Sequence, residues 1–99
     1  MVGVSERAKE ILLDRKLEAN ISDPEIGLRV ATDPGGDWVL VADHPRSGDQ
    51  VVEHAGVTVL LLSPEVQGAL VGTRVDCVEM PGGALELALT PAGMSDGHA

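Results

Sequence analysis

The chain has 99 residues, of which 43% are apolar and 23% charged, and this length and composition indicate one globular domain and exclude a disordered chain. Seven Lys and Arg against sixteen Asp and Glu give a net charge of −9, which excludes the clustered cations that bind nucleic acid or an anionic membrane. The single cysteine has no partner for an internal disulfide, and no apolar run approaches the roughly 20 residues that span a bilayer. We therefore expect a cytoplasmic protein.

Two helices are predicted, and each begins at a serine. Ser5 is placed to accept a hydrogen bond from a free amide of the first turn, and the apolar residues that follow recur at helical spacing. Ser63 and Pro64 hold the corresponding places before a second, short helix, which ends near Gly72. The apolar side chains expected on or near the inward faces of these helices are Ala8, Ile11, Leu12, Leu13, Leu17, Val66, Ala69 and Leu70.

Six strands are predicted from alternating apolar residues or short apolar runs bounded by turn residues. They are expected over residues 27–32, 38–42, 50–53, 57–62, 73–79 and 84–90. In the last two, we expect Val75, Cys77, Leu85, Leu87 and Leu89 to face inward. The order of elements predicts an α+β domain with mostly antiparallel β-sheets and two short helices, spanning residues 1–91. Residues 92–99 are expected to form a flexible tail.

A series of short strings follows a set order through residues 3–91. It begins with a capped helix that has an inward alanine, followed by a Gly-x-Arg strand that leads into a glycine-containing loop and an aromatic residue. An Asp-x-Val string then precedes Gly-Val-x-Val, and Leu-x-Gly-Thr precedes a pair formed by an apolar residue and an aspartate. The residues that carry these strings are Ser5, Ala8, Gly27, Arg29, Trp38, Asp49, Val51, Gly56, Val57, Val59, Leu70, Gly72, Thr73, Val75 and Asp76. This ordered series resembles the A-type iron–sulfur carriers, the HesB/IscA/SufA family.

The resemblance implies the fold of that family but not its ligand set. Family members hold iron or a cluster through three cysteines, one in the loop after the Gly-x-Arg strand and two in a C-terminal Cys-Gly-Cys, and thiolates are the ligands that such clusters need. Placed without gaps, the loop cysteine falls on Asp33, and the C-terminal pair falls on Gly97 and Ala99 with His98 between them. We therefore expect no cofactor and no metal site.

The loop that corresponds to the family's ligand loop is the candidate site. Asp33 and Asp37 flank a Pro-Gly-Gly turn, where an aspartate serves as a turn residue or as an oxygen ligand for a hard cation. Trp38 opens the next strand and is expected to anchor the core, with an exposed contact patch as the alternative. Cys77 shares a strand face with Val75, which favours a small buried side chain. His44, His54 and His98 lack partners at metal-ligand spacing and are expected to be solvated.

Three functions fit these observations. The first is an accessory or regulatory protein-interaction module of iron–sulfur biogenesis that has lost the cluster-binding cysteines, that is not an enzyme and that has an unidentified protein partner. The second is a carrier of iron or a cluster with a rearranged site that uses Cys77, Asp33 or His98. The third is a small-molecule binder or an enzyme on the same scaffold. The resemblance also makes a homo-oligomer possible.

Overall fold

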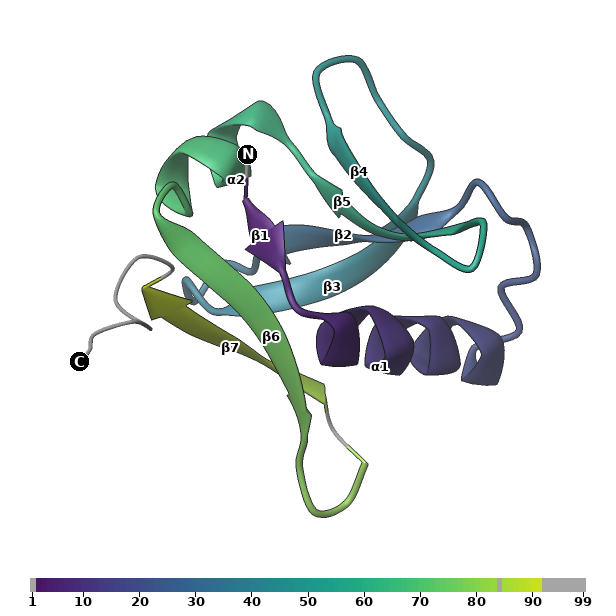
Figure 1. Ribbon diagram of the computed structural model, residues 1–99. Coiled ribbons are helices and arrows are strands. Elements are labelled where there is room, and N and C mark those ends of the chain that lie inside the picture. Colours follow the sequence, from purple (N-terminus) through teal and green to yellow (C-terminus); the bar gives the residue numbers. More distant parts are fainter. Residues whose placement is uncertain (1, 84, 92–99) are drawn as a thin grey trace.

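The computed structural model describes residues 2–83 and 85–91 (Figure 1). In chain order its elements are β1 (Gly3–Val4), α1 (Glu6–Glu18), β2 (Gly27–Thr32), β3 (Trp38–Asp43), β4 (Gln50–His54), β5 (Val57–Leu62), α2 (Pro64–Ala69), β6 (Thr73–Glu79) and β7 (Leu85–Pro91). The predicted α+β fold is confirmed, with β1 as an additional strand that is too short to leave a periodic pattern. The expected first residue of the last strand, 84, and the expected tail, 92–99, lie outside the described residues.

The strands form two sheets. One sheet has the order β1-β6-β7 and the other the order β3-β2-β5-β4. The hairpins β2–β3, β4–β5 and β6–β7 are antiparallel, whereas β1–β6 and β2–β5 are parallel. The mostly antiparallel character is thus confirmed. Each parallel pair joins segments far apart in the chain, which local patterns do not reveal.

The start of α1 is attached to the three-stranded sheet through one serine. The Oγ atom of Ser5 accepts a hydrogen bond from the amide of Ala8 at 3.0 Å, which caps the helix as expected. The same hydroxyl donates to Oδ1 of Asp76 in β6 at 2.8 Å, and the Ser5 amide donates to the Val75 carbonyl at 3.0 Å. The cap therefore also sets the position of α1 on β6.

The core lies where α1 meets both sheets, because the helix contacts β6 of one sheet and β2, β4 and β5 of the other (Figure 1). Its buried apolar residues are Val2, Ala8, Leu12, Leu28, Val30, Val52, Val59, Leu60, Leu62, Leu70, Val75 and Cys77. No helix among the described residues is long and apolar enough to cross a membrane.

Two predicted inward residues are wrong. The buried stripe of α1 runs through Ala8, Leu12 and Lys16, one helical turn apart, so Leu17 points away from it and is 59% exposed. Ala69, the last residue of α2, is exposed, whereas Leu70, which follows it, is buried. Both residues are next to a buried residue in the chain. Periodicity alone does not distinguish an apolar residue at the edge of the buried stripe from one inside it.

Lys16 can be buried because backbone carbonyls accept the hydrogen bonds that its ammonium group would otherwise donate to water. Its Nζ atom donates hydrogen bonds to the carbonyls of Asp23 at 2.8 Å and Thr58 at 3.1 Å. Burial lowers the pKa of Lys16. The side chain joins the end of α1 to the connection before β2 and to β5, so its role is structural.

We expect Gly27→Ala to lower the free energy of unfolding by about 1–3 kcal/mol, the usual cost of overpacking. A Cβ atom at Gly27 would lie 2.7 Å from Cγ2 of Thr58 and 3.2 Å from Cγ of Leu61. Urea denaturation measures the loss, and Thr58→Ser, which removes the Cγ2 methyl, is expected to reduce it in the double variant. A Gly27→Ala variant as stable as the original chain would contradict the close packing.

Candidate functional site

The turn 33–37 between β2 and β3 is closed by its own first aspartate. Oδ1 of Asp33 accepts hydrogen bonds from the amides of Gly35 at 2.9 Å and Asp37 at 3.0 Å. The Asp33 amide also donates to the Asp37 carbonyl at 2.9 Å, and Gly36 has φ +86°, a conformation that glycine adopts without strain. One carboxylate oxygen of Asp33 is therefore engaged in the turn, while Asp37 is exposed.

The structure does not bring the candidate ligands together. Within residues 2–83 and 85–91, no three His, Cys, Asp or Glu side chains form a group that could hold a metal ion. His44 lies on the surface, with its Nε2 atom 4.0 Å from Oδ2 of Asp23, and His54 ends β4. His98, together with Gly97 and Ala99, lies outside the described residues.

Cys77 is a core residue of β6 and is fully buried. Burial, with a further contribution from the Asp76 carboxylate, raises the pKa of its thiol to about 11. The thiol is therefore protonated at neutral pH and closed to solvent, whereas a metal ligand or nucleophile must be an accessible thiolate. This is the small buried side chain that its place beside Val75 predicts.

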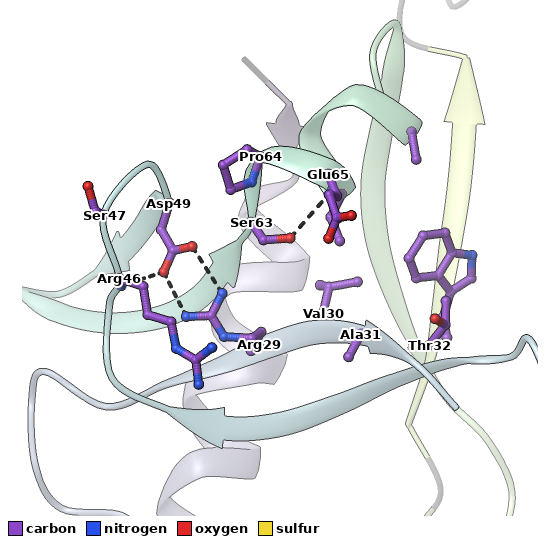
Figure 2. A pocket seen from close by; sticks show the side chains of 13 residues that line it. Arg29, Val30, Ala31, Thr32, Arg46, Ser47, Asp49, Ser63, Pro64 and Glu65 are labelled. Atoms are coloured by element: carbon purple, nitrogen blue, oxygen red, sulfur yellow. Dashed lines mark hydrogen bonds and ion pairs between the residues drawn. The ribbon is translucent and has the colours of Figure 1, made fainter. Parts of the chain in front are cut away.

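The sequence strings did not show that Arg29 and Asp49 meet. The Arg29 guanidinium donates to both carboxylate oxygens of Asp49, with Nη1 3.0 Å from Oδ1 and Nη2 2.7 Å from Oδ2. It also donates from Nε to Oδ2 of Asp43 at 2.8 Å and from Nη2 to the His44 carbonyl at 3.1 Å. The Asp49 side chain is only 1% exposed. The contacts between Arg29 and Asp49, which Figure 2 shows, attach the loop 44–49 to β2.

The only sequence signal for this pair is an arginine inside an otherwise apolar strand. Such a residue needs a buried anion, because an unpaired charge in a protein interior is costly. Four aspartates follow Arg29 before β4, and it pairs with two of them, Asp43 at the end of β3 and Asp49 in the loop 44–49.

A groove of about 590 Å³ lies beside this cluster, between β2, the loop 44–49 and α2 (Figure 2). Its polar side chains include Arg46, Ser63 and Glu65, and Trp38 also lines it. A second groove of about 340 Å³ lies between β3 and β7, and Trp38 lines it as well.

Trp38 therefore stands at the surface where the two grooves meet. It is 36% exposed and is not among the buried core residues, so the expectation that it anchors the core is not met. It directly follows the turn 33–37 in the chain and opens β3. This combination is the candidate contact surface.

The geometry is that of a known fold. No protein-family model and no curated protein matches the sequence. Among solved structures, SufA from Escherichia coli, involved in biosynthesis of iron–sulfur clusters, is 22% identical with a TM-score of 0.63, over 94% of this chain and 87% of SufA. IscA with its [2Fe-2S] cluster is 22% identical with a TM-score of 0.56, over 92% of this chain and 85% of IscA. The chain has the A-type carrier fold.

A third structure, the solution structure of a protein from Aquifex aeolicus, is 25% identical with a TM-score of 0.59. The match covers 88% of this chain and 89% of that protein. The A-type fold is thus the one that the ordered strings predict. In this chain those strings supply structural contacts: Ser5 meets Asp76, and Arg29 meets Asp49.

The same contacts predict how stability depends on pH. Hydrogen bonds from Arg29 lower the pKa of Asp43 and of Asp49, and the hydrogen bond from Ser5 lowers the pKa of Asp76. Because an unfolded aspartate titrates near pH 3.9, the stability that these carboxylates contribute is complete above roughly that pH and is lost as the pH falls through their folded pKa values.

We therefore expect the thermal midpoint to fall as the pH drops below about 4, the range in which an unfolded aspartate takes up its proton. Asp49→Asn is expected to be less stable at neutral pH and to lose less stability on acidification. The exposed Asp14→Asn serves as the matched control and should follow the original chain. An acid dependence unchanged by Asp49→Asn would show that this carboxylate does not carry the effect.

Proposed function

We propose that this chain is an accessory or regulatory protein-interaction module of iron–sulfur cluster biogenesis that binds no cluster of its own and is not an enzyme. The fold supports a place in iron–sulfur cluster biogenesis, since one similar structure holds a [2Fe-2S] cluster and another protein of this fold is involved in cluster biosynthesis. One observation carries the proposal. The residues of the scaffold make their contacts, Ser5 with Asp76 and Arg29 with Asp49, whereas Asp33 occupies the position that the resemblance assigns to the loop cysteine.

The chemistry of the described residues supports the absence of a cluster. The carboxylate of Asp33 is a hard oxygen donor already engaged in its turn, whereas clusters are held by soft thiolates. The one thiol, at Cys77, is buried and protonated. This also argues against a rearranged carrier site that uses Cys77 with Asp33.

The turn 33–37 and Trp38 are the surface that we propose for the partner. An exposed tryptophan beside a groove is the residue type that most often dominates binding energy at an interface. The neighbouring Asp33 and Asp37 favour a partner with a basic rim around an apolar pocket. The overall charge of −9 and the unpaired cysteine support a location in the cytoplasm.

Nuclear magnetic resonance titration tests the proposal. The ¹⁵N-labelled chain is titrated with SufA and, separately, with IscA, and we expect amide shifts at residues 33–38. Trp38→Ala is expected to weaken binding at least tenfold, as a residue that contributes more than about 1.4 kcal/mol does. Val71→Ala, at an exposed apolar residue elsewhere, should bind normally. Shifts that spare the turn, or no shifts with either protein, would contradict the proposed contact surface.

The 590 Å³ groove favours one other function, that of a small-molecule binder. Its size suits a ligand, and Arg46, Ser63 and Trp38 offer a cation, a hydroxyl and an aromatic face. A thermal-shift screen of metabolites tests it: a specific rise in melting temperature that Ser63→Ala or Trp38→Ala removes would support this function. No rise with any metabolite would leave the groove without a role in small-molecule binding.

A further inference from the structure

Strand β2 extends beyond its neighbour β5 in the four-stranded sheet. The parallel pairing between the two strands stops at Arg29 opposite Leu61, because β5 ends one residue later, where the chain turns toward α2. On its other side, β2 stays paired with β3 as far as Thr32. Residues 30–32 therefore have a neighbouring strand on one side only, and on the other side they line the groove of about 590 Å³ (Figure 2).

The hydrogen bonds of the turn show which backbone groups face the groove. The Asp33 amide donates to the Asp37 carbonyl at 2.9 Å, so the backbone of Asp33 points toward the β3 side. Successive residues of an antiparallel pair alternate between facing the partner strand and facing away from it. Ala31 therefore bonds to β3, whereas Thr32 presents its N–H and C=O, and Val30 its C=O, to the groove. In the described part of the chain, no segment outside the strands supplies a hydrogen bond to these groups.

The groove also carries a carboxylate that is open to a basic ligand. Glu65, at the start of α2, lines the groove and is exposed, and within residues 2–83 and 85–91 it forms no ion pair. The two arginines of the groove are already paired with aspartates. The acidic turn 33–37 directly follows residues 30–32 in the chain. A bound segment with positive charge is therefore favoured over one with negative charge.

We propose that this groove binds an extended, basic peptide segment of the partner protein, which adds to the sheet along residues 30–32. The inference rests on the proposed function, because the segment belongs to the protein that contacts the turn 33–37 and Trp38. The acceptor, donor and acceptor that Val30 and Thr32 present have the spacing of a strand, and another strand matches them. At about 3.3 Å per residue, residues 30–32 provide roughly 10 Å of edge, enough for about three residues of the segment.

The side chains of the segment have partners in the same groove. A lysine or arginine pairs with the carboxylate of Glu65, and an apolar side chain packs against Trp38, which lines the groove as well. Main-chain hydrogen bonds thus hold the segment, while Glu65 and Trp38 select its side chains.

Hydrogen exchange at single amides tests the proposal. The probe is the hexapeptide Lys-Val-Lys-Val-Lys-Val, blocked at both ends, in which basic and apolar side chains alternate between the two faces of a strand. We expect saturation with this probe to slow exchange of the Thr32 amide at least tenfold. Exchange of the Ala31 amide should change far less, because that amide already bonds to β3. Unchanged exchange at Thr32 would overturn the proposal.

Two substitutions of Thr32 separate its backbone N–H from its side chain. Thr32→Pro removes the N–H that faces the groove without removing a hydrogen bond to β3, a place in a strand where proline is tolerated. We expect this variant to fold and its dissociation constant for the probe, measured by the fluorescence of Trp38, to rise at least tenfold. Thr32→Val keeps the N–H and should bind like the original chain. Equal affinities of the two variants would overturn the proposal.

N-methylation of the probe gives a test that needs no variant of the protein. The N–H groups of the lysines and those of the valines lie on opposite edges of the extended peptide. We expect methylation of one set to abolish binding and methylation of the other set to leave it nearly unchanged. Equal effects of the two methylated probes would show that the peptide does not bind as a strand and would overturn the proposal.

Charge is tested at Glu65. Glu65→Gln is expected to raise the dissociation constant of the lysine probe several-fold, and Glu10→Gln, at an exposed residue of α1, should leave it unchanged. Equal binding of the blocked hexapeptide Glu-Val-Glu-Val-Glu-Val would overturn the proposed basic character of the segment.

The outcome for the groove is distinguishable from the outcome for the proposed function. Amide shifts at residues 33–38 with SufA or IscA, without protection of Thr32 by either protein or by the probe, would overturn this inference and leave the contact surface in place. Protection of Thr32 by the probe, without shifts from SufA or IscA, would support the peptide groove and contradict the proposed contact with these proteins.

Discussion

Replacing Arg29 by methionine is expected to lower the free energy of unfolding by about 3–5 kcal/mol, the usual cost of breaking a buried ion pair from one side. The Asp49 carboxylate would stay buried without its two guanidinium hydrogen bonds, and the loop 44–49 would lose its attachment to β2. Because a domain of this size is stable by only about 5–15 kcal/mol, the variant should unfold at a much lower urea concentration.

Arg46→Met is the matched control for this substitution. Arg46 forms an ion pair with the same Asp43 at 2.9 Å, but its side chain is largely exposed. Exposed pairs contribute about 0–1 kcal/mol, so the loss should be small. Equal losses in the two variants would contradict the view that the buried Arg29–Asp49 pair holds the loop.

Leu12→Ala is expected to lower the free energy of unfolding by about 2–5 kcal/mol, through lost burial and the cavity that remains. Leu12 is fully buried at the centre of α1, and the helix contacts both sheets. Urea denaturation followed by circular dichroism measures the loss. One shared core also predicts a single transition in the variant.

Leu17→Ala, in the same helix, is the control, because Leu17 lies largely in solvent. Its effect should stay within about 0.5 kcal/mol. A large loss from Leu17→Ala would contradict the exposure of this side chain, and a small loss from Leu12→Ala would contradict the position of the core.

Much of the fold could be predicted because its elements are locally encoded. The serine caps at Ser5 and Ser63, the proline at the start of α2 and the turn residues 33–37 each act within a few residues. The division into two sheets could not be predicted in this way. It depends on the parallel pairs β1–β6 and β2–β5, which join distant segments.

The position of the candidate turn in the chain was predictable, but its geometry was not. Asp33 and Asp37 lie in the turn between β2 and β3, and Trp38 opens β3. The tryptophan's exposure depends on how β3 and β7 approach each other, which no local pattern records. Likewise, Lys16 occupies an inward helical position because the carbonyls of Asp23 and Thr58 receive its ammonium group.

The central claim is that an A-type scaffold persists here without a cluster site, and anaerobic reconstitution of the full chain with ferrous iron and sulfide tests it most directly. Visible absorbance and an iron count after desalting are the readouts, with SufA treated in parallel as the control. We predict no thiolate-to-iron charge-transfer band and no iron bound in proportion to protein, since Cys77 is buried and Asp33 is engaged in its turn. A brown protein that retains iron would contradict the account.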